Sequence, residues 1–503
     1  MMKEGKIYLV GAGPGDIGLF TLKGKHLLVQ ADVVVYDALV SPEILALIPD
    51  SARRIDVGKR AGSHPVPQGE INRILLQEAM AGKLVVRLKG GDPFLFGRGG
   101  EELELLSEYN IPFEIVPGVT SAISVPAYAG IPVSHRSLSS SVHIVAGHTK
   151  HVPEAQIDYE ALVRLGGTLI FLMGVGALEE ICKGLLRAGM PAETPAAIIE
   201  RGTTAAQRTV VSTVKALPEH AREAGIGTPA VIAVGRVCAL AEEFSWMEKR
   251  PLGGRTVLVT RPRDRAGRFS QLLRDYGAQV IELPCIETMP LEPNPELDEA
   301  FSRLREYSWL VFTSSAGVRL FFDALRGRGK DVRALGGIKL AAIGSATAAE
   351  LEMRGLIPDL VPEIYSGEAL GKALVREVRP DERVLLARAK EGSAGLPKTL
   401  KAAAVAYDDL AVYETRYTWP NADVAARMLD AGEVDYVAFT SASTVRGFVN
   451  TLGRQDNLKF TAVCIGKATE AAAKESGMRT AIAKEATIES MVERMIELGK
   501  GEL

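Results

Sequence analysis

Glycines and charged residues are concentrated in one short run of the sequence, Val85–Glu102, which reads VVRLKGGDPFLFGRGGEE. An apolar strand should end at Gly90 and Gly91, where the missing side chains let a ligand touch the backbone. Asp92 adds a fixed negative charge, and Pro93 ends strand pairing. Ligands of open α/β sheets bind at such carboxyl ends of strands. The alternative is a tight turn capped by an aspartate, but it leaves the other glycines and three basic residues without a role. We therefore predict a ligand site here.

A second glycine-rich loop, Gly11–Asp16 (GAGPGD), follows the first apolar run of the chain. It looks like a dinucleotide-binding fingerprint, but its third glycine comes one place early and Pro14 stiffens the turn. The loop therefore does not favour NAD as a ligand.

Short apolar runs alternate with helical stretches along the chain, which predicts parallel α/β sheets that hold these loops at strand ends. In the first half we expect strands near residues 7–10, 33–36, 84–88, 113–116, 142–146, 168–173, 196–200 and 230–234. The proline-rich segment 115–132 separates two sets of four strands and predicts lobes at about 1–116 and 117–241. The segment 242–252 mixes charge with proline and predicts an interdomain linker.

The sequence after this linker repeats itself. Four pairs of segments match in the same order: VLVTR at 257–261 with VLLAR at 384–388, ET at 287–288 with ET at 414–415, FTSS at 312–315 with FTSA at 439–442, and IGSAT at 343–347 with IGKAT at 465–469. The first three pairs are 127 residues apart and the last pair is 122 apart. So long a period indicates two related lobes rather than a solenoid, and polar loops at their strand ends would face a shared cleft.

Length and composition limit the class of protein. A chain of 503 residues predicts three or four domains, and 47% hydrophobic residues support full cores. The formal net charge of −3 argues against nucleic-acid binding, so local basic clusters must meet any acidic ligand. All seven histidines lie at or before His220, which argues against histidine acid–base chemistry in the second half.

Other features predict a soluble protein of the cytoplasm. The four cysteines form no CxxC pair, which fits a reducing compartment and offers no zinc site. The apolar stretch at the N-terminus is too short for a signal peptide. Residues 115–134 carry no charge, but three prolines argue against a membrane helix there.

Five blocks of the first half carry a family resemblance: GAGPGD at 11–16, YDALV at 36–40, GKRAG at 58–62, RLKGGDPFLFGRGGEE at 87–102 and PGVTSAISVPAYAGIPVSHR at 117–136. Residues 5–240 resemble the tetrapyrrole methyltransferases, and among them most resemble the uroporphyrinogen-III C-methyltransferases. The resemblance implies a two-lobed αβα fold that binds S-adenosylmethionine in the cleft between its lobes, largely through backbone groups. It also implies a homodimer formed through this half.

The resemblance also implies a set of cofactor contacts: Pro14, Gly90, Gly91, Asp92, Leu95, Thr120, Ser121, Met173, Gly202 and Ala230. Glycines admit the bulky ligand, Asp92 suits a ligand that carries positive charge, and Met173 packs softly against an adenine or sulfonium. Without the resemblance, Met173 would be interpreted as core filling. The family normally has Thr-Gly-His where this chain has Ala146-Gly147-His148, so Ala146 is given no role.

Asp37 and Lys59 match the family's proton acceptor and proton donor for methylation of a pyrrole carbon. General acid–base assistance is worth about two to four powers of ten in rate. Taken alone, Asp37 would be a helix cap and Lys59 a solvated charge. The substrate carries many carboxylates, which arginine forks bind well. The candidate contacts are Arg60, His64, Arg87, Arg98 and Arg136, which equally fit surface ion pairs. We expect Arg87 and Arg98 to face the tetrapyrrole rather than the cofactor.

Residues 252–503 resemble uroporphyrinogen-III synthases through the repeated segments and LAVYET at 410–415. The resemblance implies two α/β lobes, 253–284 plus 416–503 and 288–412, joined by a two-stranded ladder. Their implied reaction is cofactor-free closure of hydroxymethylbilane to uroporphyrinogen III, with inversion of the last ring. Tyr413 is the candidate assisting acid or, equally, an anchor between the lobes. The candidate carboxylate contacts are Arg261, Ser314, Ser315, Thr440, Ser441 and Thr469, and the hydroxyl groups among them equally fit helix N-caps.

The two resemblances together predict a bifunctional enzyme. Its second half would form uroporphyrinogen III, and its first half would methylate C2 and C7 to give precorrin-2, which leads to sirohaem and cobalamin. Two alternatives remain: the first half could methylate another corrin intermediate, and the second half could be a bilobed binding module without catalysis.

Overall fold

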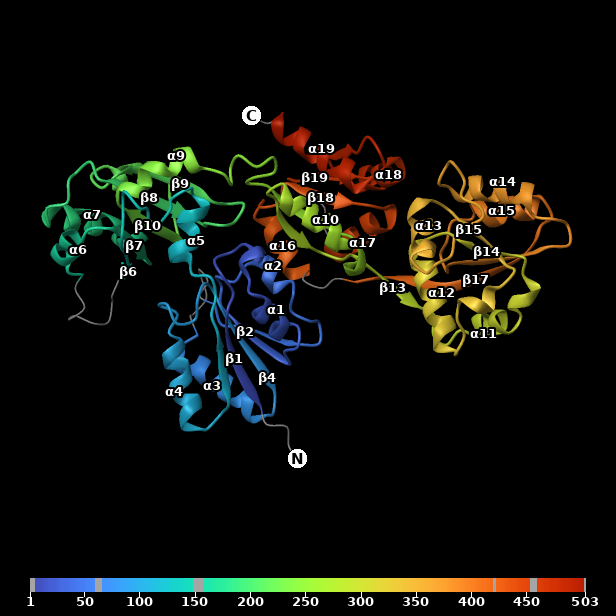
Figure 1. Cartoon of the computed structure of the whole chain (residues 1–503), viewed down its shortest axis with the longest axis horizontal. Helices are drawn as coiled ribbons and strands as arrows, with labels where there is room; N and C mark the ends of the chain where they lie inside the picture. Colours follow the sequence, from blue (N-terminus) through green and yellow to red (C-terminus); the bar gives the residue numbers. More distant parts are fainter. Residues whose placement is uncertain (1–4, 59–65, 148–156, 419–421, 453–458, 502–503) are drawn as a thin grey trace. The chain divides into compact units, whose positions relative to one another are not determined.

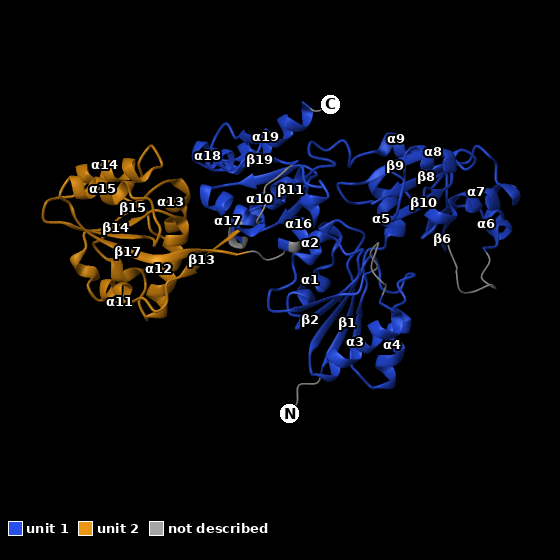
Figure 2. Cartoon of the chain, turned by 180° about the vertical axis from the view of Figure 1, so that it is seen from behind, with its two compact units in different colours: residues 1–284, 419–503 blue, residues 285–418 orange. Residues whose placement is uncertain are grey.

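The computed structural model describes residues 5–58, 66–147, 157–418, 422–452 and 459–501. The chain forms two compact units, Cys285–Thr418 and the remainder (Figures 1 and 2). No helix in the described ranges is long and apolar enough to cross a membrane.

The first sheet of the larger unit is parallel, with strand order β3-β2-β4-β1-β5. Its strands are β1 (Lys6–Gly11), β2 (Val33–Tyr36), β3 (Arg53–Asp56), β4 (Leu84–Lys89) and β5 (Phe113–Val116). Its helices are α1 (Leu22–Leu28), α2 (Pro42–Leu45), α3 (Gln68–Met80) and α4 (Gly99–Glu108). The sequence did not predict β3, because this edge strand reads RRID and lacks a buried apolar face.

The second sheet is mixed, with strand order β6-β7-β10-β8-β9. Its strands are β6 (Val142–Ala146), β7 (Thr168–Leu172), β8 (Pro195–Glu200), β9 (Arg208–Thr213) and β10 (Ala230–Val234). Only β6 and β7 pair in parallel, so the expectation of a parallel sheet is wrong here. The physical reason is that residues 201–207 between β8 and β9 are too few for a crossover helix. Its helices are α5 (Ser121–Tyr128), α6 (Tyr159–Leu165), α7 (Leu178–Arg187), α8 (Leu217–Glu223) and α9 (Ala241–Phe244).

The segment 242–252 is packed rather than loose. The ring of Trp246 meets the ring of Tyr128 edge-on, with centroids 5.0 Å apart. Its indole N–H donates to the carbonyl of Ala127 at 3.0 Å. Leu252 is fully buried with the apolar residues of the third sheet.

That third sheet is parallel, with strand order β12-β11-β18-β19-β20. Its strands are β11 (Thr256–Val259), β12 (Gln279–Glu282), β18 (Tyr436–Phe439), β19 (Thr461–Cys464) and β20 (Thr480–Ile482). Its helices are α10 (Arg263–Asp275), α16 (Ala422–Asp430), α17 (Ala442–Leu452), α18 (Lys467–Glu475) and α19 (Ile488–Lys500).

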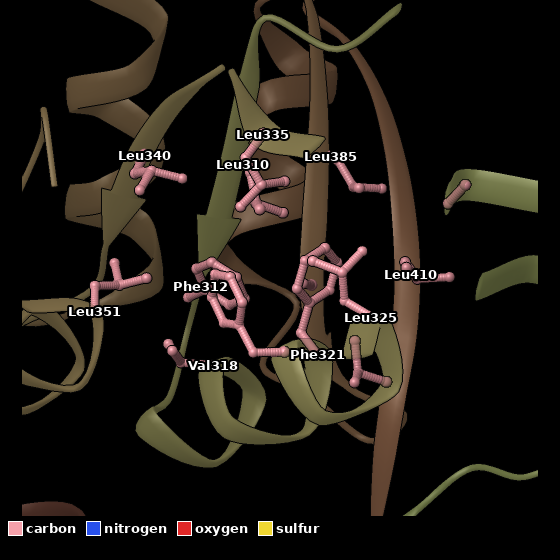
Figure 3. Packing of buried hydrophobic residues seen from close by; sticks show 14 of the residues in the cluster. Leu310, Phe312, Val318, Phe321, Leu325, Leu335, Leu340, Leu351, Leu385 and Leu410 are labelled. Atoms are coloured by element: carbon pink, nitrogen blue, oxygen red, sulfur yellow. The ribbon is translucent and has the colours of Figure 1, made fainter. Parts of the chain in front are cut away.

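The smaller unit holds the fourth sheet, with strand order β13-β17-β16-β14-β15. Its strands are β13 (Ile286–Pro290), β14 (Trp309–Phe312), β15 (Lys339–Ala342), β16 (Arg383–Ala389) and β17 (Ala406–Tyr417). Its helices are α11 (Pro295–Ser302), α12 (Ser315–Gly327), α13 (Ser345–Glu352), α14 (Gly367–Glu377) and α15 (Gly395–Ala402). In its core, Phe312 and Phe321 pack edge-to-face among leucines (Figure 3).

The third and fourth sheets show the predicted duplication. Strands β12-β11-β18-β19 occur in the same spatial order as their repeat counterparts β17-β16-β14-β15. The matched segments VLVTR and VLLAR lie in β11 and β16, and FTSS and FTSA follow β14 and β18. Each sheet therefore combines strands from both copies of the repeat.

One buried carboxylate joins α2 to the third sheet. Glu43 is 5% exposed, and its Oε1 accepts from the backbone N–H of Val280 at 3.3 Å and from Nε of Arg274 at 3.4 Å. Burial raises the pKa of Glu43 to about 7 and Asp16 adds to this rise, while Arg274 and the Val280 N–H oppose it. Between about pH 4.5 and pH 7, the folded chain therefore keeps Glu43 protonated, whereas the unfolded chain has released this proton.

This raised pKa makes the stability of the fold pH-dependent. The stabilisation from protonated Glu43 is fully present below about pH 4.5 and is lost as the pH rises through about 7. We expect Glu43→Gln to remove this pH dependence. The wild type loses stability between pH 5 and pH 8, so at pH 8 the variant should gain up to about 3 kcal/mol in free energy of unfolding relative to the wild type. Calorimetric unfolding at pH 5 and pH 8 measures it, with the exposed Glu248→Gln as control. An unchanged pH dependence in Glu43→Gln would contradict the assignment.

Candidate functional site

Three loops at the carboxyl ends of β1, β4 and β5 meet through their glycines. Gly13 and Gly91 exchange two backbone hydrogen bonds, of 3.1 and 2.7 Å. A Cβ on Gly118 would lie 2.1 Å from the carbonyl oxygen of Gly91, and a Cβ on Gly11 would lie 2.5 Å from Cα of Gly118. Gly91 also has a φ of +66°, and a Cβ there would enter open space. These approaches require glycine, and they leave backbone groups accessible at the strand ends.

The carboxylate of Asp92 holds these loops together. Its Oδ1 accepts from the N–H groups of Phe94 at 2.9 Å and Leu95 at 3.1 Å, and its Oδ2 accepts from Gly118 at 3.0 Å. Asp92 was predicted as a fixed anion facing the cofactor. The structure instead shows the turn-cap alternative, with both oxygens bound to backbone N–H groups.

We expect Asp92→Ala to weaken binding of the methyl donor by about 10- to 100-fold, because three backbone N–H groups lose a charged acceptor. Titration calorimetry with S-adenosylhomocysteine measures the effect. Ring closure by the second half should be unchanged. Loss of both activities would mean that the halves do not fold independently.

A cavity of about 1500 Å³ lies beside these loops. Ten of the predicted site residues border it: Pro14, Asp37, Arg87, Gly90, Leu95, Arg98, Ser121, Met173, Gly202 and Ala230. They come from both the first and the second sheet, and Gln279 and Glu433 border the cavity too. The volume exceeds the usual 300–1,000 Å³ of a small-ligand pocket.

The remaining predicted residues of the first half lie elsewhere. Gly91, Asp92 and Thr120 support the loops, and Thr120 caps α5 by accepting from the N–H of Ala122 at 3.2 Å. Arg136 is exposed and does not border this cavity, so its role as a substrate contact stays a prediction. The predicted residues Lys59, Arg60 and His64 lie outside the described residues.

Two cavity residues have backbone features that the sequence did not reveal. Met173 is 55% exposed, so core filling does not explain it, and its φ of +56° is unusual for a non-glycine residue. Gly202 approaches α5 so closely that a Cβ there would lie 2.3 Å from Cγ1 of Val125. Both residues border the cavity, so the thioether of Met173 and the backbone of Gly202 are available to a ligand there.

Asp37 follows β2 and is held by an arginine on β4. Its Oδ1 accepts from Nη2 of Arg87 at 2.7 Å, and its side chain remains 29% exposed at the cavity. Arg87 itself is 1% exposed, and its guanidinium also binds Glu102. The prediction that Arg87 faces the tetrapyrrole is therefore corrected, because its donors are committed inside the protein. Arg98 borders the cavity but pairs with Glu101 at the surface.

Sequence reasoning missed several polar residues that hold segments bordering the cavity. Oδ2 of Asp16 accepts from the hydroxyl of Tyr128 at 2.7 Å, and the backbone N–H of Asp16 donates to Oγ1 of Thr203 at 3.2 Å. Burial, together with the bond to Asp16, raises the pKa of Tyr128 above its ordinary range. These contacts tie the first glycine loop to α5 and to the segment after β8. The only sequence signal was the position of Asp16 at the end of GAGPGD.

In the smaller unit, Tyr413 is 7% exposed and its ring belongs to the hydrophobic core. Its hydroxyl lies 2.7 Å from Oγ of Ser314, which also accepts from the N–H of Gly317 as the N-cap of α12. In the larger unit, Oγ of Ser441 accepts from the N–H of Thr444. The capping alternative therefore describes both serines.

The other candidate substrate contacts of the second half differ in solvent exposure. Thr469 is 4% exposed, so little of the residue is open to a substrate. Arg261, Ser315 and Thr440 are partly exposed beside strand ends and helix starts.

The four α/β sheets and the cavity are typical of a protein that binds small molecules. Residues 6–218 match the family model of Tetrapyrrole (Corrin/Porphyrin) Methylases, and residues 267–493 match that of Uroporphyrinogen-III synthase HemD. The chain belongs to the tetrapyrrole methylase family in its first half and to the uroporphyrinogen-III synthase family in its second. Both resemblances seen in the sequence are confirmed.

Two curated relatives support this assignment, and one solved structure is similar to the first half in sequence. The chain is 47% identical over 502 residues to the porphyrin biosynthesis protein HemD of Ruminiclostridium josui, covering 100% of each chain. It is 40% identical over 358 residues to a uroporphyrinogen-III C-methyltransferase of Bacillus subtilis (strain 168), covering 71% of this chain and 73% of that one. A solved uroporphyrin-III C-methyl transferase from Thermus thermophilus, complexed with S-adenyl homocysteine, is 41% identical over 47% of this chain and 100% of that one, with a TM-score of 0.41.

Proposed function

We propose that this chain catalyses two consecutive steps of tetrapyrrole biosynthesis. Its second half closes hydroxymethylbilane to uroporphyrinogen III, and its first half methylates this product at C2 and C7 to give precorrin-2. The observation that carries the methylase assignment is the cavity that brings the glycine loops, Met173 and Asp37 together. Precorrin-2 then serves sirohaem and cobalamin formation.

The residues at the cavity fit S-adenosylmethionine. Backbone groups of Gly90, Gly202 and Ala230 would bind its polar parts, and the exposed Met173 would contact its adenine or sulfonium. When bound, the cofactor supplies an electrophilic methyl group. Leu95 and Ser121 complete this wall of the cavity.

Asp37 is the proposed proton acceptor. A new carbon–carbon bond forms at a pyrrole carbon, and the macrocycle must lose one proton for each methyl group gained. The carboxylate of Asp37 reaches the cavity and is held by Arg87 on its inner side. Lys59 is proposed as the proton donor, and Arg60, His64 and Arg98 as contacts for the substrate carboxylates.

For ring closure, the second half mainly has to orient the bilane chain and needs few reactive side chains. The electron-rich bilane expels its own hydroxyl as water when that oxygen is protonated, and holding the chain in a closing geometry lowers the barrier further. Tyr413 is the proposed proton donor, with its hydroxyl positioned by Ser314. Arg261, Ser315 and Thr440 are proposed contacts for the carboxylates.

Two separate assays test the proposal. Hydroxymethylbilane given to the purified chain without S-adenosylmethionine should yield the type III macrocycle; formation of only the spontaneous type I isomer would refute the synthase assignment. Uroporphyrinogen III given with S-adenosylmethionine should gain two methyl groups by mass. Gain of none would refute the methylase assignment, and methylation of a later corrin intermediate alone would favour the alternative.

We also propose that the chain acts as a homodimer through its methylase half, in the cytoplasm and without nucleic acid or membrane. Resemblance to the methylase family and the formal net charge of −3 support this. Sedimentation equilibrium should give twice the mass of one chain. The mass of a single chain would refute the dimer.

A further inference from the structure

Three buried charged side chains form a cluster with Asp37 at the cavity wall. Arg87 and Lys89 lie two residues apart on β4 and so point to the same face of the sheet. Both contact Glu102 of α4, which is 0% exposed, while Arg87 also contacts Asp37. Two positive and two negative groups balance, which is the condition under which charges are buried.

One oxygen of Glu102 receives almost every bond in this cluster. Its Oε1 accepts from Nζ of Lys89 at 2.7 Å, from Nε of Arg87 at 3.2 Å and from Nε2 of Gln68 at 3.2 Å. Its Oε2 is buried and has no hydrogen-bond partner among the described residues. Leaving an oxygen unpaired is costly, so stability alone does not explain a carboxylate at this position.

The geometry links Glu102 to the cavity through Arg87. The Nη2 atom of Arg87 lies 3.1 Å from Oε1 of Glu102 and 2.7 Å from Oδ1 of Asp37. The other contacts of this guanidinium are long, at 3.4 Å to the carbonyls of Val35 and Leu88. Glu102 therefore fixes the plane of the guanidinium, and the guanidinium fixes the carboxylate of Asp37.

Lys89 completes this arrangement from the cavity side. It is 4% exposed yet borders the cavity, and burial together with the neighbouring Arg87 lowers its pKa. Glu102 opposes this shift and holds the ammonium group in place. The cluster thus extends from the interior to two points of the cavity wall, Asp37 and Lys89.

We propose that Glu102 is a positioning residue for methyl transfer, which acts through Arg87 to hold the carboxylate of Asp37 in its reactive orientation. The proposal rests on the methylase function proposed above. A small displacement of a reacting group costs up to about 100-fold in rate. Loss of Glu102 should therefore lower kcat for methylation. The KM for S-adenosylmethionine should be unchanged, because the hydrogen bonds of the Glu102 carboxylate among the described residues go to Gln68, Arg87 and Lys89 and not to the glycines of the loops.

The test compares three variants of the full chain. Glu102→Gln keeps the shape of the side chain and removes its charge, and we expect kcat to fall by about 10- to 100-fold. Glu104→Gln, on the exposed side of the same helix, should behave as the wild type. The double variant Glu102→Gln with Lys89→Gln restores the balance of buried charge. We expect its thermal midpoint to recover toward the wild-type value while its kcat remains low.

Each outcome supports or overturns the positioning role. A double variant that regains kcat together with its thermal midpoint would show that charge imbalance alone caused the loss, and would overturn the proposal. So would a Glu102→Gln variant with the wild-type kcat, or one that loses cofactor affinity instead. A wild-type chain that binds S-adenosylhomocysteine but never transfers a methyl group would overturn the methylase function itself and the positioning role with it.

Discussion

Replacement of Asp37 by asparagine should lower kcat for methyl transfer by about 100- to 10,000-fold, because the amide keeps the shape of the carboxylate but cannot accept the proton. Asp37 is the acidic side chain proposed to take that proton, and it is both exposed at the cavity and bound to Arg87. Quenched-flow measurement of methyl incorporation into uroporphyrinogen III gives the rate. The affinity for S-adenosylhomocysteine should stay within about threefold of the wild-type value, a change below 1 kcal/mol.

Ring closure by the same chain provides the internal control for Asp37→Asn. The second half does not use Asp37, so formation of uroporphyrinogen III from hydroxymethylbilane should keep its wild-type rate. Methyl transfer at the wild-type rate would show that another group accepts the proton.

Replacement of Gly118 by alanine should weaken cofactor binding by roughly 100-fold or more, since a Cβ at this position meets backbone that cannot give way. The nearest atom would be the carbonyl oxygen of Gly91 at 2.1 Å, followed by Cα of Gly11 at 2.7 Å. Relief of the clash must separate the three loops whose backbone groups line the strand ends. Titration calorimetry with S-adenosylhomocysteine measures the loss.

Gly100 offers a matched control for Gly118→Ala. It lies in α4, only a few residues from the same loops, and a Cβ there meets nothing within 4 Å. Gly100→Ala should bind S-adenosylhomocysteine with wild-type affinity. Equal affinity for Gly118→Ala and Gly100→Ala would contradict the role given to the glycine contact.

The parts of the site that could be predicted from the sequence are local ones. Val85–Glu102 carries its own strand, turn and helix start, so the prediction of a ligand loop follows from residue types in order. The duplication was equally visible, because strands β11 and β16 keep nearly the same sequence. Both inferences needed no knowledge of contacts between distant segments.

The parts that could not be predicted depend on such contacts. Arg87 looked free in the sequence, but its partner Asp37 comes from another strand 50 residues away. Asp92 looked like a charge for a ligand until Gly118, on a third loop, was seen to use one of its oxygens. The second sheet is mixed because the short connection after β8 makes β9 run antiparallel to β8, and β10 runs antiparallel to β8 as well. The residue types in these strands do not indicate in which direction each strand runs.

The most direct test of the account is a single incubation of the purified chain with hydroxymethylbilane and S-adenosylmethionine. We predict a type III product that carries two added methyl groups. In the time that the wild type needs for this, Asp37→Asn should form uroporphyrinogen III that is still almost entirely unmethylated. A type I macrocycle, or a type III macrocycle without added methyl groups from the wild-type chain, would contradict the claim that one chain performs both steps.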